Sequence, residues 1–163
     1  MTSSPIDVRT LPSQTVEWYT PPAVFDALGL TFDLDPCSPG EGKSFVPARR
    51  HYTEADDGLA QPWEGLVFMN PPYGRATRHW VERLAAHGNG IALVFARTDA
   101  AWWHTAARAA DLTCHTTGRL RFYPGTTDAP GGSPALGSSL FAFGPVATAA
   151  LATSNLGLLV TVR

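Results

Sequence analysis

The sequence has few of the residues that build disulfide or zinc frameworks. Only two cysteines occur among 163 residues, Cys37 and Cys114, and no Cys-x-x-Cys pair is present. The five histidines show no metal-ligand spacing. We therefore expect neither a disulfide scaffold nor a metal centre.

Long apolar runs are also missing. No run reaches the roughly 18 residues that cross a bilayer, and residues 1–13 lack an apolar stretch behind a basic start. Neither a membrane span nor an ordinary signal peptide is expected, so the cytoplasm is the expected compartment.

Charge is scarce as well. Charged residues make up 16% of the chain and the formal net charge is −2. Tight, indiscriminate DNA binding usually needs a basic surplus that neutralises phosphates. The composition therefore argues against tight, indiscriminate DNA binding, but it is compatible with a local basic face.

What the sequence does contain fits one globular domain. Hydrophobic residues make up 44% of the chain, a balance typical of folded rather than disordered proteins. The length suits a single core, and no internal repeat is present. We expect a flexible lead-in at residues 1–15 and a single domain over 16–163.

Apolar runs and chain breakers predict an alternation of strands and helices in the first two thirds of the chain. Residues 66–69 and 91–95 are apolar runs typical of strands buried on both faces. A short strand is expected at 30–34, helical spacing follows over 76–87, and another helix is expected after Thr98 or Asp99 as its cap. A first helix is predicted with Thr20 as cap, Pro21 and Pro22 in its first turn and Gly29 at its end.

The remaining segments complete an α/β pattern. Residues 36–62 and 125–137 are rich in proline and glycine and are predicted to be mostly loop. Further strands are expected at 112–116, 119–123, 139–143 and 157–162, and a short helix at 146–152. The order predicts right-handed crossovers and a mostly parallel sheet, with 119–123 and 139–143 as an antiparallel pair at one edge. We expect a compact three-layer α/β sandwich.

The segment Asn70-Pro71-Pro72-Tyr73 directly follows the apolar run at 66–69. In open α/β sheets, ligands bind at the carboxyl ends of strands. An exocyclic amino group on a heterocycle is a poor nucleophile because its lone pair is delocalised into the ring. The Asn70 side-chain carbonyl and the Pro71 backbone carbonyl can accept its hydrogens, consecutive prolines stiffen the turn, and Tyr73 can stack on an extruded base. The alternative is a proline-rich turn with a core-facing tyrosine.

The chain resembles S-adenosylmethionine-dependent amino-methyltransferases, especially the small phage and prophage DNA N6-adenine methyltransferases of the Dam-like family. The similarity runs from Glu17 to Gly144. It rests on segments in that family's order: Glu17-Trp18-Tyr19-Thr20-Pro21-Pro22, Phe32-Asp33-Leu34-Asp35-Pro36, Asp56-Asp57-Gly58-Leu59, Trp63, Asn70 to Tyr73, and Arg97-Thr98-Asp99. The resemblance implies a Rossmann-like class I methyltransferase fold, reduced in size between Pro36 and residue 66.

The resemblance also implies where S-adenosylmethionine binds. The implied contacts are Tyr19, Thr20 and Pro21 at the methionine end, Asp35 and Pro36 on the loop that carries the cofactor, and Asp57 at the adenine amino group. A hydroxyl at a helix start suits a carboxylate, and an ionised carboxylate suits an amine.

Each of these segments has a structural alternative. Thr20 can simply cap its helix, and Asp35-Pro36 can be a plain turn, since Pro39 intervenes before the glycines at 40 and 42. Asp56 competes with Asp57 for the adenine contact, and either can cap a loop. Glu54 is the candidate for the ribose hydroxyls.

Arginines are the candidate substrate contacts. Arg75 and Arg78 follow the Asn-Pro-Pro-Tyr turn, together with His79, and Arg97 ends the next strand on the edge expected for Asn70. Arg119 and Arg121 alternate on a predicted strand and are expected to share a face. A row of arginines can bind a nucleic-acid backbone; the alternative is a set of solvated surface side chains.

The resemblance therefore implies transfer of a methyl group to N6 of adenine in duplex or single-stranded DNA, with a role in phage or prophage DNA modification and restriction. RNA, a free nucleotide or a protein glutamine are alternative acceptors. A non-catalytic cofactor-sensing or partner-binding module is an alternative of another class. The target sequence and the oligomeric state are not predicted.

Overall fold

A seven-stranded mixed sheet forms the centre of the molecule. The computed structural model describes residues 17–125 and 128–162, so the predicted lead-in at 1–15 lies outside the described residues. The strand order is β3-β2-β4-β5-β8-β6-β9. These strands are β2 (Phe32–Asp35), β3 (Ala48–His51), β4 (Val67–Met69), β5 (Gly90–Phe95), β6 (Leu112–Thr116), β8 (Ser138–Phe143) and β9 (Gly157–Val160).

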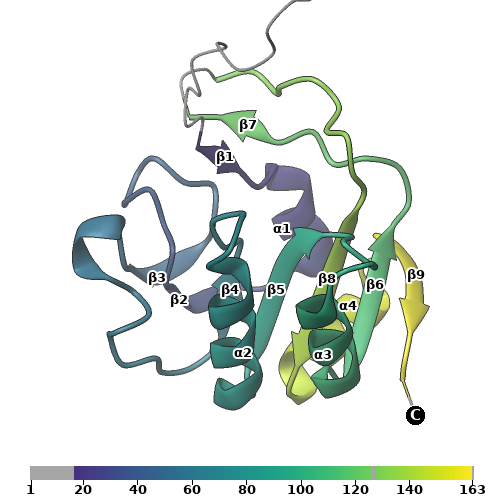
Figure 1. Cartoon of the computed structure of the whole chain (residues 1–163). Helices are drawn as coiled ribbons and strands as arrows, with labels where there is room; N and C mark the ends of the chain where they lie inside the picture. The colour runs from purple at the N-terminus through teal and green to yellow at the C-terminus, as the bar shows by residue number, and fades with distance from the viewer. Residues whose placement is uncertain (1–16, 126–127, 163) are drawn as a thin grey trace, which may run out of the picture.

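Helices cover both faces of this sheet (Figure 1). The helices α1 (Pro22–Leu28) and α4 (Pro145–Thr153) pack on one face, and α2 (Thr77–His87) and α3 (Ala101–Ala109) on the other. Alternate residues of β4 enter the two cores: Phe68 packs on the α1–α4 side, whereas Val67 and Met69 pack on the α2–α3 side. The predicted α/β class is confirmed, as are the strands and helices expected around β4, α2 and β5.

The position of the antiparallel strand differs from the prediction. Strands β3, β2, β4 and β5 are parallel, but β8 lies inside the sheet, antiparallel to both β5 and β6. All six residues of β8 are buried, which suits a central strand. The expected pairing of 119–123 with 139–143 is wrong, because residues 119–122 form no strand.

A second, two-stranded sheet lies beyond the carboxyl ends of the central parallel strands (Figure 1). It pairs β1 (Trp18–Tyr19) antiparallel with β7 (Tyr123–Pro124). This pairing brings the beginning of the described chain against the segment that follows β6. Two residues a strand carry too little pattern for sequence periodicity to detect.

The segment 36–62, predicted to be mostly loop, contains the edge strand β3 and a short 3-10 helix, η1 (Glu54–Asp56). Arg49 and Arg50 of β3 are exposed, so this strand lacks the apolar alternation that marks a half-buried strand. It is held by parallel pairing with β2.

Both predicted helix caps are wrong. Pro21 is the N-cap of α1, and Thr20 lies one residue too early to bond the first turn. Ala100 is the N-cap of α3, while Asp99 pairs with Arg97 instead. Within residues 17–125 and 128–162, no helix is long and apolar enough to span a membrane.

Candidate active site

The carboxyl ends of β2 and β4 meet at the point where the chain reverses its direction across the sheet. From β2 the chain passes to β3 on one side, then returns to β4 and β5 on the other. Crevices at such switch points bind ligands in open α/β sheets. Here the Asp35 loop and the Asn70 turn touch, since the Cys37 thiol donates to the Asn70 backbone carbonyl at 3.3 Å. The structure thus brings two predicted site segments together.

The Asn70 side chain is held between two partners. Its Nδ2 donates to the Trp18 carbonyl at 3.3 Å, and its Oδ1 accepts from the Tyr73 hydroxyl at 2.9 Å. A backbone carbonyl can only accept, so the Trp18 contact fixes which amide atom is the nitrogen. Asn70 Oδ1 is consequently oriented as an acceptor, and it already accepts one hydrogen bond, from the Tyr73 hydroxyl.

Tyr73 lies flat on Phe95, with ring centroids 4.1 Å apart and an interplanar angle of 17°. The residue is 38% exposed, but its hydroxyl end points inward to Asn70. Burial of the hydroxyl raises the pKa of Tyr73 well above its ordinary value, and the electrostatic interaction with Cys37 raises it further. Tyr73 is therefore a protonated hydrogen-bond donor at neutral pH. One face of its ring is covered by Phe95, so a stacked base has to use the other face.

The two prolines occupy different environments. Pro71 is buried and Pro72 is exposed. The Pro72 carbonyl accepts from the Thr77 hydroxyl at 2.8 Å, and that hydroxyl accepts from the Gly74 amide at 3.1 Å. Thr77 therefore fixes the turn, a role that the sequence alone did not indicate. Among the described residues the Pro71 carbonyl accepts no hydrogen bond, which leaves it able to accept one from a ligand.

Asp35 ends β2 in a buried polar cluster. Its Oδ1 accepts from the Cys37 amide at 3.2 Å, and its Oδ2 lies 4.0 Å from His51 Nδ1. The same His51 nitrogen lies 3.0 Å from the Ser38 hydroxyl, and His51 Nε2 lies 3.1 Å from the Ala48 carbonyl. Pairing of β3 with β2 carries His51 inward, and its side chain is 13% exposed.

Burial raises the pKa of the Asp35 carboxyl to about 7, against the opposing hydrogen bonds from Cys37 and Ser38. Because this pKa lies above that of an unfolded aspartate, folding favours the protonated form. The resulting stabilisation is complete below about pH 4 and is lost as the pH rises through about 7. The same carboxyl becomes an anion more readily beside a cationic ligand.

Asp35→Asn tests this assignment. The variant keeps the side-chain shape but cannot ionise, and every other ionisable side chain is common to both proteins. Relative to wild type, the free energy of unfolding of the variant is expected to improve by several kcal/mol between pH 4 and pH 8. Urea unfolding at intervals of pH measures the difference; parallel curves for the two proteins would contradict the assignment.

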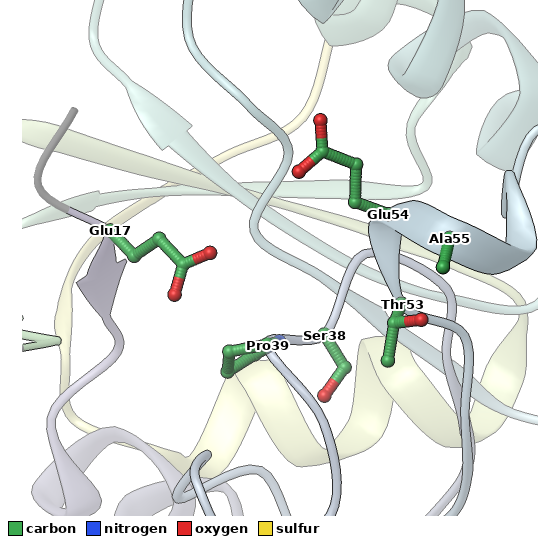
Figure 2. Close-up of a pocket in the computed structure, with 6 residues that line it drawn as sticks. All are labelled: Glu17, Ser38, Pro39, Thr53, Glu54 and Ala55. Carbon is green, nitrogen blue, oxygen red and sulfur yellow. The ribbon is translucent and has the colours of Figure 1, made fainter.

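A hollow of about 460 Å³ opens beside this cluster. It is lined by Glu17, Ser38, Pro39, Thr53, Glu54 and Ala55. Figure 2 shows the carboxylates of Glu17 and Glu54 on two sides of the hollow, with Pro39 and Ser38 below both of them in this view. Glu54 is the residue predicted for the ribose hydroxyls, whereas no ligand contact is predicted for the Glu17 carboxylate. Two carboxylates across one hollow suit hydroxyl donors or a cation.

The Asp56-Asp57-Gly58 segment lies against the Asp35-Pro36 turn. A Cβ added at Gly58 would lie 1.9 Å from the Pro36 carbonyl oxygen, so only glycine permits this approach. Asp56 caps the loop, accepting from both the amide and the hydroxyl of Thr53 at 2.7 Å. Asp57 is exposed at the end of η1, and its contact with an adenine stays a prediction.

The segment before α1 supplies an unpartnered polar atom. Thr20 is 3% exposed, and its hydroxyl has no hydrogen-bond partner in the part of the chain that the structure describes. Pro21 is buried next to it, and the neighbouring Tyr19 hydroxyl donates to Glu17 at 2.9 Å. A buried hydroxyl without a partner costs free energy unless a ligand satisfies it.

The predicted arginines do not form one row. Arg75 and Arg78 are exposed beside the Asn70 turn, and Arg97 lies on the same sheet edge, bonded to Asp99 at 3.2 Å. Arg119 instead donates to the Pro134 carbonyl at 2.7 Å. The expectation that Arg119 and Arg121 share a strand face is wrong, because the chain is not extended into a strand there.

The site thus places two hydrogen-bond acceptors, a stacked tyrosine and a buried carboxyl at one switch point. A family model described as DNA N-6-adenine-methyltransferase (Dam) matches residues 8–156 of the chain. No curated protein and no solved structure matches it.

Proposed function

The chain belongs to the DNA N-6-adenine-methyltransferase (Dam) family, and from this premise we propose that it transfers the methyl group of S-adenosylmethionine to N6 of adenine in DNA. The observation that carries the proposal is the pair of acceptors after β4. Asn70 Oδ1 is oriented by the Trp18 carbonyl, and the Pro71 carbonyl has no partner among the described residues.

The residues at the switch point fit S-adenosylmethionine. Bound there, this cofactor supplies an electrophilic methyl group on a sulfonium, together with an ammonium, a carboxylate and a ribose. The unpartnered Thr20 hydroxyl would hold the carboxylate, with Tyr19 and Pro21 beside it. Asp35, next to Pro36, would face positive charge, and Glu54 with Glu17 would accept from the ribose hydroxyls. Asp57 would accept from the adenine amino group.

The protein's own contribution to the chemistry is to make an amino group nucleophilic. Asn70 Oδ1 and the Pro71 carbonyl would each accept one N6 hydrogen, which draws the nitrogen out of conjugation with its ring. Both acceptors are fixed before the substrate arrives, so little reorganisation accompanies the reaction. The new bond from N6 to the methyl carbon would form as the sulfonium sulfur–carbon bond breaks, which releases S-adenosylhomocysteine, and the N6 proton would then pass to water. Tyr73, with Pro72 shaping its turn, would hold the base by stacking.

The topology supports a Rossmann-like class I methyltransferase arrangement. Asp35 and Pro36 of the proposed cofactor site follow β2 and the catalytic residues follow β4, on either side of the switch point, while Tyr19 to Pro21 precede α1. Arg75, Arg78 and Arg97 lie near enough to that edge to contact phosphates of DNA. The resemblance to small phage and prophage enzymes supports a role in modifying such DNA against restriction.

Mass spectrometry of nucleosides tests the proposal directly. Methyl-free duplex DNA, single-stranded DNA, RNA and free nucleotides are each incubated with the protein and S-adenosylmethionine, then digested. We expect N6-methyladenine in DNA, which must be absent when either the protein or the cofactor is omitted. Product confined to RNA, nucleotides or protein glutamine would refute the proposed acceptor. Cofactor binding by calorimetry without product on any acceptor would indicate a binding module.

A further inference from the structure

Trp18 is an exposed aromatic residue attached directly to the catalytic turn. It lies on β1 and is 43% exposed. Its backbone carbonyl accepts from Asn70 Nδ2 at 3.3 Å. The main chain therefore fixes the position of Trp18 relative to Asn70, and the indole ring takes no part in that contact.

The indole is held in place from one side. A Cβ added at Gly131 would lie 2.7 Å from the Trp18 ring, so the ring rests directly on the glycine backbone. The Gly131 amide in turn donates to the Phe122 carbonyl at 2.8 Å. Pairing of β1 with β7 fixes the main chain of Trp18 as well. An exposed ring that is restrained in this way loses little conformational freedom when a ligand stacks on it.

A row of aromatic rings runs from Phe122 through Phe95 to Tyr73. The Phe122 ring lies 6.2 Å from Phe95, and Phe95 lies 4.1 Å from Tyr73. Phe122 is buried and Phe95 is half-buried, whereas Tyr73, at the end of the row, and Trp18 are exposed. Both exposed residues also bond the side chain of Asn70. The surface around the two acceptors is thus aromatic.

This surface combines the two features that hold an unstacked strand. Proteins that bind single strands combine a positively charged groove with aromatic rings, because every base has a face that can stack. Arg75 and Arg78 are exposed beside the Asn70 turn, whereas Arg97 is paired with Asp99. The net charge of the chain is −2, so the rings supply a contact that charge alone does not.

We propose that the indole of Trp18 stacks on an unstacked base of the acceptor strand and so holds that strand with adenine N6 at Asn70. The inference rests on the proposed function and adds to it a specificity-determining residue. An adenine reached by Asn70 must leave its helix, which costs stacking with its neighbours. Trp18 replaces part of that lost stacking.

Substitution of Trp18 isolates the ring, because every variant keeps the backbone carbonyl that orients Asn70. We expect Trp18→Ala to lower kcat/KM for DNA by about 10- to 100-fold, mainly through KM. Trp18→Phe is expected to stay within about threefold of wild type, since it keeps an aromatic face. Leu158→Ala serves as the control, because Leu158 is 66% exposed on β9, at the opposite edge of the sheet from β3.

Two further measurements separate stacking from a structural role. Cofactor affinity by calorimetry and the midpoint of thermal unfolding are expected to be unchanged in Trp18→Ala. An oligonucleotide with 2-aminopurine at or beside the target adenine should show a smaller fluorescence change with this variant than with wild type.

Undiminished kcat/KM in Trp18→Ala, or a loss that accompanies weaker cofactor binding or a lower unfolding midpoint, would overturn the inference. Wild-type protein that methylates no DNA would instead refute the proposed function, so the two failures are distinguishable.

Discussion

Asn70→Ala is expected to lower kcat for DNA methylation by roughly 100- to 1000-fold, the range seen when one positioned polar group is removed from a reacting centre. The variant removes the oriented Oδ1 and leaves only the Pro71 carbonyl to accept from N6. Cofactor affinity is expected to stay within about twofold, since the proposed cofactor contacts precede β4 in the chain. Single-turnover kinetics with labelled cofactor, together with calorimetry, measure both quantities.

Asn70→Asp is the matched control for this experiment. A carboxylate keeps an acceptor at the same position, but it cannot donate to the Trp18 carbonyl as Nδ2 does. The expected order of rates is therefore wild type, then Asn70→Asp, then Asn70→Ala. Full activity in the alanine variant would remove the proposed mechanism.

Tyr73→Ala is expected to lower kcat/KM for DNA by about 10- to 100-fold, the loss typical of removing one stacked ring. Tyr73→Phe separates the ring from the hydroxyl. It keeps the stacking on Phe95 and removes the hydroxyl that occupies Asn70 Oδ1. An incoming amino group then has no hydrogen bond to displace, so we expect the phenylalanine variant to be at least as active as wild type.

Steady-state rates over a range of DNA concentrations measure both variants, and the unfolding midpoint serves as the control for packing. If Tyr73→Phe were as impaired as Tyr73→Ala, the hydroxyl rather than the ring would be the functional group. The hydrogen bond to Asn70 would then be part of the reaction and not a feature of the free protein only.

The elements that could be predicted are those whose pattern lies within a single segment. The strands β4 and β5 are apolar runs because helices cover both faces of the sheet and bury the side chains on both sides of each strand. The helix over Thr77–His87 follows from its own apolar face. The Asn-Pro-Pro-Tyr segment is also a local pattern, and it indicated both the family and the location of the candidate site.

The elements that could not be predicted depend on partners distant in the chain. The strand β3 has two exposed arginines and exists because it pairs with β2. Nothing near Thr20 shows that its hydroxyl ends up buried and unpartnered. The strand at 119–123 was predicted from local alternation, but the chain there crosses toward β7 instead.

The sequence by itself determined the α/β class and the family, and it placed two possible acceptors, Asn70 and Pro71, after an apolar strand, because residue type and local periodicity specify which groups a turn offers. Only the tertiary structure decided that Trp18 orients Asn70, that Tyr73 occupies its oxygen, and that His51 lies inward beside Asp35. Those contacts join residues up to 52 positions apart. Hydrogen bonds and burial between such residues follow from how strands are ordered across the sheet, and no local pattern records that order.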